Sequence, residues 1–163
     1  MTPADGRPAP AGGHVLAQLN VADPVAPMDS AELAGFVAGL ERINALAEAS
    51  DGFVWRLQDE DGDATSFRPF GPDTLVNLSV WRDLDALTAF VFRSDHAGFM
   101  RRRSEWFRRP AAPSTVLWWV PSDHRPDLEE AGARLERLRR DGAGPTAFTL
   151  AAPFPTPSSP ASA

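Results

Sequence analysis

The residues best suited to chemistry lie close together in two segments, Arg93-Ser94-Asp95-His96 and Arg101 to Phe107. They place one of three histidines near arginines and aromatic side chains, in a chain without cysteine, lysine or tyrosine. An imidazole exchanges a proton near neutral pH, and a guanidinium stabilises a carboxylate or an enolate. The pattern therefore predicts an acid–base site for a small molecule.

On a helix that begins near His96, one side carries Phe99, Met100, Arg103, Trp106 and Phe107. We predict His96 as acid or base, Arg103 and Arg93 as the stabilising cations, and Trp106 as a stacking surface for a planar substrate. In the alternative interpretation, His96 hydrogen-bonds a backbone carbonyl at a helix junction while Trp106 and Phe107 belong to the core. For at least one of the clustered arginines, a solvated position is the simpler explanation.

Composition excludes several functional classes. The 163 residues suffice for one domain with a hydrophobic core. A net charge of -6 argues against a general nucleic-acid binder. The absence of cysteine excludes disulfides, thiolate nucleophiles and iron–sulfur clusters. His14 and His124 are not spaced as zinc ligands, and no nucleotide-binding or serine-hydrolase motif is present. We therefore expect no metal site and no cofactor, with haem on His96 as an alternative.

The ends of the chain and one acidic segment lack core-forming residues. We predict disordered tails at residues 1–13 and 153–163 around a single domain at residues 14–152. The acidic segment Asp59 to Asp63 is interpreted as a solvated turn, because a calcium loop would need Glu where Phe70 stands. No apolar run reaches the roughly 20 residues of a membrane span, so a cytoplasmic location without membrane contact is expected.

The periodicity of apolar residues changes in a regular order between the tails. A helix capped by Asp29 or Ser30 runs to near Asp51-Gly52, and a second is capped by Asp83 and includes Leu84 to Val91. The His96 segment continues as another helical piece to about Arg108. A last amphipathic helix spans about Pro126 to Arg140. Strands are predicted at His14–Val21, Phe53–Gln58, Thr74–Trp81 and Ser114–Pro121.

The order β-α-β-β-α-β plus a final helix predicts an α+β, ferredoxin-like fold with a four-stranded antiparallel sheet and both crossover helices on one face. Alternation is expected to turn Val76, Leu78 and Val80 toward these helices. The opposite face would present Gln18, Asn20, Arg56, Gln58, Asn77, Ser79 and Trp81. Pairing two such faces in a homodimer would enclose a small-molecule cavity, with Trp119 and Trp106 adding aromatic surface. Alternatively, this face is solvated in a monomer.

Six segments together resemble an uncharacterised bacterial family of the dimeric α/β-barrel superfamily, over about residues 13 to 155. They are His14–Asn20, Phe53–Asp59, Val76–Trp81, Phe92–His96, Arg102–Phe107 and Leu117–Pro121. The resemblance implies a ferredoxin-like protomer that dimerises through its sheets, and it brings no established reaction. The wider superfamily includes cofactor-free antibiotic-biosynthesis monooxygenases, polyketide cyclases, muconolactone isomerase-like enzymes and haem-binding proteins.

The first functional hypothesis is a cofactor-independent enzyme of secondary metabolism that moves a proton on a planar or polycyclic, enolisable substrate, leading to oxygenation, cyclisation or isomerisation. In this hypothesis Gln18, Arg56 and Asn77 orient substrate oxygens, while Trp81, Trp106 and Trp119 exclude water. The second is a non-catalytic binding module for haem or a hydrophobic small molecule. The third is a structural dimer without a ligand.

Overall fold

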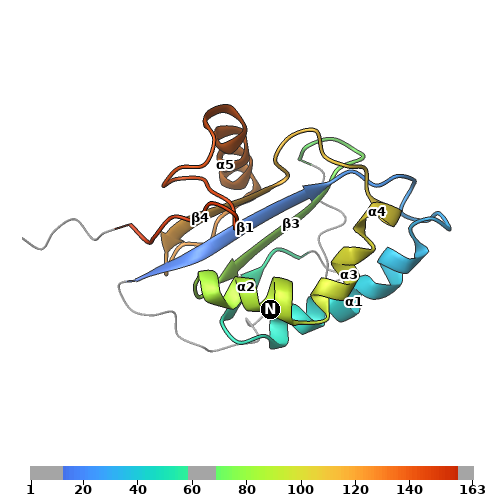
Figure 1. The fold of residues 1–163 in the computed structure, drawn as a ribbon, viewed down its shortest axis with the longest axis horizontal. Helices are drawn as coiled ribbons and strands as arrows, with labels where there is room; N and C mark the ends of the chain where they lie inside the picture. Colours follow the sequence, from blue (N-terminus) through green and yellow to red (C-terminus); the bar gives the residue numbers. More distant parts are fainter. Residues whose placement is uncertain (1–12, 59–68, 158–163) are drawn as a thin grey trace, which may run out of the picture.

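The computed structural model describes residues 13–58 and 69–157, so the predictions for residues 1–12, 59–63 and 158–163 lie outside the described residues. Four antiparallel strands form one sheet in the order β2-β3-β1-β4 (Figure 1). The strands are β1 (His14–Ala22), β2 (Phe53–Arg56), β3 (Leu75–Trp81) and β4 (Thr115–Pro121). The helices are α1 (Ala34–Ala49), α2 (Leu84–Arg93), α3 (His96–Arg101), α4 (Arg103–Trp106) and α5 (Leu128–Asp141). The predicted α+β, ferredoxin-like class with an extra C-terminal helix is confirmed.

A side-chain cap sets the start of α2 but not that of α1. The side chain of Asp83 accepts a hydrogen bond from the backbone N–H of Ala86 at 2.9 Å, which confirms Asp83 as the cap of α2. The predicted cap of α1 at Asp29 or Ser30 is wrong. A turn in which the backbone N–H of Ser30 bonds to the carbonyl of Pro27 at 2.9 Å delays the helix until Ala34.

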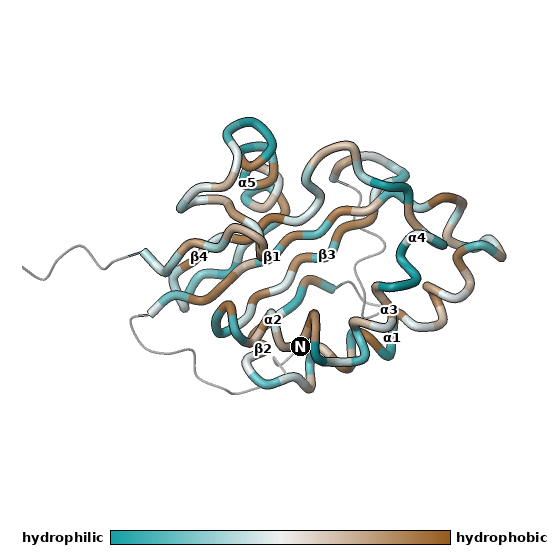
Figure 2. Tube along the Cα trace, viewed as in Figure 1, coloured by the Kyte–Doolittle hydropathy of each residue, from teal (hydrophilic) through white to brown (hydrophobic). Residues whose placement is uncertain are grey.

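The two faces of the sheet are covered by different helices (Figure 1). α5 packs its buried side chains Ala131, Leu135 and Leu138 on one face. The helices α1 to α4 lie on the other side. Figure 2 shows hydrophobic and hydrophilic residues in alternation along β1 and β3, as two differently lined faces require.

The prediction of which face meets the crossover helices is wrong. Val76, Leu78 and Val80 pack in the cluster that contains the α5 side chains, whereas Trp81 packs with residues of α1 and α2. The prediction assigned the more apolar face to the two longer crossover helices. That face instead matches the apolar stripe of α5, and the more polar face lies under α1 and α2.

This arrangement removes the sequence-based reason for a sheet-to-sheet dimer. Such a dimer requires one sheet face to be left uncovered, but residues of both faces, among them Leu16, Ala17, Leu78 and Leu117, are at most 1% exposed in one chain. A cavity lined by the predicted polar face lies inside one chain, so no second chain is needed to enclose it. In residues 13–58 and 69–157, no helix is long and apolar enough to span a bilayer.

The C-terminal segment packs on the edge of the domain. Phe148 forms a bridge with Leu117 of β4 and is fully buried. Phe154 lies 6.0 Å from Phe148 between ring centroids, and its carbonyl accepts a hydrogen bond from the indole of Trp119 at 2.9 Å. Residue 154, assigned to a tail by the sequence, therefore contacts the core.

Candidate functional site

A cavity of about 270 Å³ lies between the sheet and the helices α1 to α4; we call it the main cavity. Its floor is the face of the sheet that carries Gln18, Asn77, Ser79 and Trp81. Its walls come from the helices and include Phe36, Ile43, Asn44, Phe90, His96, Phe99, Arg103 and Trp106. An aromatic lining with a few convergent polar groups is typical of a small-molecule site.

Hydrogen bonds hold the polar floor in place. Gln18 Nε2 donates to Asn77 Oδ1 and to Ser79 Oγ, both at 2.9 Å, and Trp81 Nε1 donates to Ser79 Oγ at 3.0 Å. Because Ser79 Oγ accepts twice, its own hydrogen remains free to donate to a ligand oxygen. Asn77 is exposed although it lines the cavity, so solvent reaches the floor.

A β-bulge turns Arg56 toward the main cavity. The pairing of β2 with β3 runs Phe53 to Trp81, then Trp55 to Val80, then Arg56 to Ser79, so one extra residue follows Phe53. Without the bulge, alternation would send Phe53 and Arg56 to opposite faces. The buried Arg56 donates through Nε to Glu48 Oε1 at 2.8 Å, so its charge is compensated by the protein.

His96 combines both interpretations that the sequence leaves open. Its Nδ1 lies 3.4 Å from the backbone carbonyl oxygen of Val91, and its ring centroid is 4.6 Å from that of Phe90. It also lines the main cavity. Since a carbonyl can only accept, the neutral imidazole carries its hydrogen on Nδ1 and its lone pair on Nε2.

The environment keeps this imidazole neutral. Desolvation lowers the pKa of His96 below its ordinary value, and the Val91 carbonyl offsets this only in part. A histidine that is neutral at pH 7, with Nε2 unprotonated, is prepared to accept a proton. The geometry therefore favours a general base over a general acid in the resting state.

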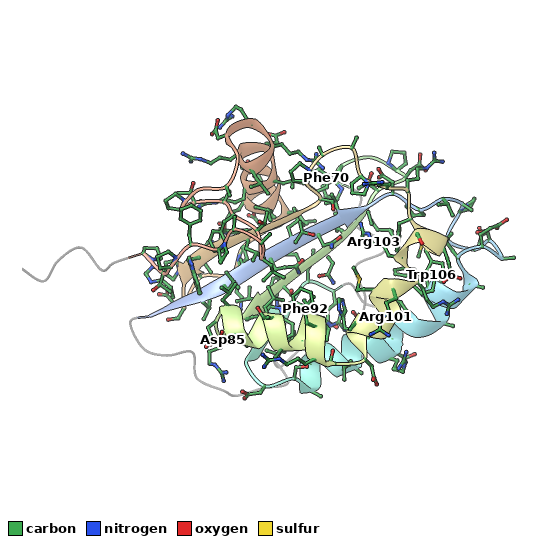
Figure 3. The ribbon with its side chains drawn as sticks, viewed as in Figure 1. Phe70, Asp85, Phe92, Arg101, Arg103 and Trp106 are labelled. Carbon is green, nitrogen blue, oxygen red and sulfur yellow. The ribbon has the colours of Figure 1, made fainter. Side chains whose placement is uncertain are left out.

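Arg103 provides a charge that the protein does not neutralise. In the described part of the chain its guanidinium makes neither an ion pair nor a hydrogen bond, and its Cζ lies 5.7 Å from the centroid of the Phe107 ring. Desolvation lowers the pKa of Arg103, although arginine stays charged at neutral pH. The neighbouring Arg102 differs, because it pairs with Glu105 at 2.9 Å and lies over Trp106. Figure 3 shows Arg103 and Trp106 close together beside the sheet.

Aromatic rings build the helical wall of the main cavity. Phe99 lies 4.8 Å from Trp106 and 5.7 Å from Phe36 between centroids. At the other end, Trp81 stacks on Phe90 at 5.0 Å with an interplanar angle of 27°. These surfaces suit a planar ligand.

The structure brings most of the predicted site residues together. The main cavity is lined by Gln18, Asn20, Arg56, Asn77, Ser79, Trp81, His96, Arg103 and Trp106. Two residues lie elsewhere. Arg93 is exposed at the end of α2, and Trp119 packs near Phe148 at 6.3 Å.

Sequence reasoning missed the contribution of α1, which adds Phe36, Ile43 and Asn44 to the lining. A usable signal was present in the pattern. Asn44 is a polar residue next to Ile43 and four positions after Leu40, within an otherwise apolar helix stripe. In residues 13–58 and 69–157, no group of three or more histidine, aspartate or glutamate side chains could hold a metal ion.

Solved structures similar to this chain share a low sequence identity with it. The protein of unknown function NE2512 from Nitrosomonas europaea is 19% identical, with a TM-score of 0.44, over 71% of this chain and 96% of the other. Rv0793 from Mycobacterium tuberculosis is 16% identical, with a TM-score of 0.44, over 70% and 98%. A mutant form of SnoaB, a cofactor-independent oxygenase from Streptomyces nogalater, is 16% identical, with a TM-score of 0.41, over 71% and 97%.

No curated protein matches the chain. A family model does match residues 15–163, which include every helix and strand except the first residue of β1. This match confirms the resemblance to an uncharacterised family. The chain belongs to the family described as a domain of unknown function, DUF3291.

Proposed function

We propose that this protein is a cofactor-independent enzyme of secondary metabolism that moves a proton on a planar, enolisable small molecule bound in the main cavity. One observation carries the proposal: the neutral imidazole of His96 and the unpaired guanidinium of Arg103 line the same aromatic-walled cavity in the described part of the chain. A base and a fixed cation are what enolate formation requires.

The proposed step is removal of a carbon-bound proton next to a carbonyl group. His96 Nε2 accepts the proton and becomes an imidazolium, while the electron pair of the C–H bond moves onto the carbonyl oxygen. Arg103 stabilises the resulting enolate, and hydrogens of Ser79 and Asn77 are the candidate donors that orient it. Reprotonation, addition to a carbonyl within the molecule, or reaction with dioxygen would then give isomerisation, cyclisation or oxygenation.

Cavity size limits the substrate class. An apolar protein cavity of about 150 Å³ accepts benzene. A cavity of about 270 Å³ therefore has room for about two fused rings. Larger polycyclic substrates would extend past Asn77 toward solvent, since this residue is exposed.

The test uses 2-tetralone, a bicyclic ketone with acidic C–H bonds, in D₂O. We expect the protein to accelerate the exchange of these hydrogens for deuterium, measured by NMR, and His96→Gln to abolish the acceleration without loss of ketone binding. Arg93→Gln is the matched control, because it removes a charge near His96 that does not line the main cavity. Equal exchange rates with wild-type protein, His96→Gln and buffer would refute the proposed enzyme.

A second candidate function is a non-catalytic binding module. It is favoured by the polar floor, because both hydrogens of the Gln18 amide are used in hydrogen bonds within the protein and are not available to orient a substrate oxygen. Binding of 2-tetralone without faster exchange would support it. A visible absorption band from bound haem that disappears in His96→Ala would assign haem as the ligand.

The homodimer and the cytoplasmic location are also proposals, and the resemblance found in the sequence is what supports the dimer. Both sheet faces are covered within one chain, so a dimer would have to use another surface. Phe92, which is 63% exposed on α2, is one apolar residue available to it. Light scattering of the purified protein measures the mass, and substitution of Phe92 by Ser would reduce it to that of one chain if α2 forms the contact.

A further inference from the structure

A second cavity, of about 320 Å³, lies where β1 ends and shares Arg103 with the main cavity. We call it the arginine cavity, because Arg103, Arg108 and Arg139 line it. Figure 3 labels Arg103 and Phe70, two of its lining residues, near the end of β1. Arg103 lines both cavities, whereas Arg108 and Arg139 line only this one.

The charge of the arginine cavity is opposite to that of the whole chain. Three guanidinium groups face one carboxylate, that of Asp23, while the complete sequence has a net charge of -6. Asp23 Oδ1 already accepts a hydrogen bond from the hydroxyl of Thr74 at 2.5 Å. Local positive charge in a concave site attracts anions and raises their local concentration.

Two of the arginines are held in place by the backbone around the cavity. Arg139 donates through Nε to the carbonyl of Pro113 at 2.8 Å, which leaves its two terminal nitrogens to bind a ligand. The backbone N–H of Arg108 donates a hydrogen bond to the carbonyl of Asp23 at 2.8 Å, which fixes the backbone from which the Arg108 side chain extends. Arg103, half-buried and without a counterion among the described residues, is the third cation.

The rest of the lining is mainly apolar. Val21, Leu135 and Phe70 contribute side chains, together with Pro110, Ala111 and Ala112. Val21 and Leu135 are 7% and 1% exposed and lie beneath the wall, while the accessible apolar surface belongs to Phe70, which is 37% exposed, and to the exposed Pro110, Ala111 and Ala112. A site that pairs guanidinium groups with such a surface fits a ligand that has an anionic end and an apolar body.

We propose that the arginine cavity binds a small organic anion, with its carboxylate or phosphate at Arg103, Arg108 and Arg139 and its apolar body against Phe70, Pro110 and Ala111. This site adds a second ligand to the proposed function, and it shares Arg103 with the main cavity. An anion bound there would also compensate the charge of Arg103.

The test titrates the protein with 4-fluorobenzoate at constant ionic strength and follows its ¹⁹F signal by NMR. We expect Arg139→Gln and Arg108→Gln each to weaken binding about fivefold, the upper range for an exposed charge pair. Arg101→Gln is the matched control, because Arg101 is an exposed arginine of the same region that lines neither cavity. Equal weakening in all three variants would show nonspecific attraction and overturn the proposal.

Two further ligands separate the parts of the proposal. Neutral 4-fluorobenzyl alcohol should bind at least about tenfold more weakly than 4-fluorobenzoate, because it lacks the charge that the arginines recognise. Inorganic phosphate should compete only at much higher concentration, because it lacks the apolar body. Displacement by phosphate at a similar concentration would assign the site to a simple oxyanion and overturn the organic part.

One more variant excludes the main cavity as the binding place. His96→Gln alters the main cavity but not the arginine cavity, so its affinity for 4-fluorobenzoate should equal that of the wild type. If 4-fluorobenzoate bound more weakly to His96→Gln than to the wild type, but bound equally well to Arg139→Gln, the ligand would lie in the main cavity and this proposal would be refuted. The proton-transfer proposal would survive that result, since 2-tetralone exchange tests it independently.

Discussion

The two faces of one sheet serve different purposes in this protein. The face toward α5 is filled with apolar side chains such as Leu78, Trp118 and Leu135, each at most 1% exposed. The face toward α1 and α2 instead has Gln18 and Ser79 on its floor and a cavity above them. In this sheet, one face therefore contributes mainly to the stability of the fold, and the other face lines a cavity that a ligand can occupy.

The largest expected effect is on the filled face. Leu78→Ala should lower the free energy of unfolding by about 2–5 kcal/mol, because a buried leucine loses its contacts and leaves a void. Urea unfolding measures the change. Asn77→Ala on the opposite face of the same strand is the comparison and should cost less, because it removes one hydrogen-bond acceptor of Gln18 and no buried apolar side chain. Equal losses in the two variants would mean that the faces do not divide stability as described.

On the cavity face, His96→Gln should slow the exchange of 2-tetralone hydrogens by a factor of about 10²–10⁴, the range for a general base. The free energy of unfolding at pH 7 should change far less than in Leu78→Ala. Paired measurements of exchange and urea unfolding check this. A variant that unfolds easily but keeps its exchange rate would give His96 a structural role only.

Replacing Ser79 by Ala should cost about 1–3 kcal/mol of stability, because Gln18 and Trp81 would each keep a buried donor without its acceptor. Thermal unfolding reports the loss. The affinity for 2-tetralone should fall as well if the Ser79 hydroxyl orients the ligand. Loss of stability with unchanged affinity would limit the polar floor to a structural role.

The pH dependence gives the smallest effect. Because folding lowers the pKa of His96, the unfolded chain binds a proton at a higher pH than the folded protein does. Stability supplied by this residue is therefore constant above its unfolded pKa and falls as the pH drops toward the folded pKa, by at most about 1.4 kcal/mol per pH unit. Urea unfolding between pH 7 and 5 should show a smaller decline for His96→Gln than for the wild type. Parallel curves would mean that His96 is solvated in the folded protein.

Local sequence signals predicted the elements but not their partners. Alternation placed β1 and β4 to within one residue, and the cap of α2 at Asp83 is confirmed by its hydrogen bond. The choice of sheet face depends on how well two apolar surfaces fit, and the stripe of α5, with Ala131, Leu135 and Leu138, fits the more apolar face. No periodicity within a single strand reports such a fit.

The residues of the candidate site were also only partly predictable from the sequence. The cluster of His96, Arg103 and Trp106 follows from helical spacing, and the structure places all three on one cavity. Arg93 is the last residue of α2, directly before the helix break at Ser94, and is exposed. The aromatic Trp119 lies too far toward the end of β4, where the C-terminal segment covers it. Such placements depend on tertiary packing, which residue types alone do not encode.

The extra residue at the bulge in β2 determines which face of the sheet each later residue of the strand points to. Inserting one residue between Trp55 and Arg56 would shift Arg56 by one pairing position, so that it would turn to the opposite face and leave Glu48 and the cavity. A change of one residue in length would thus do more to the site than most substitutions within it. Family members whose β2 differs in length by one residue would then differ in the charge of the cavity wall, because the residue equivalent to Arg56 would point to the other face.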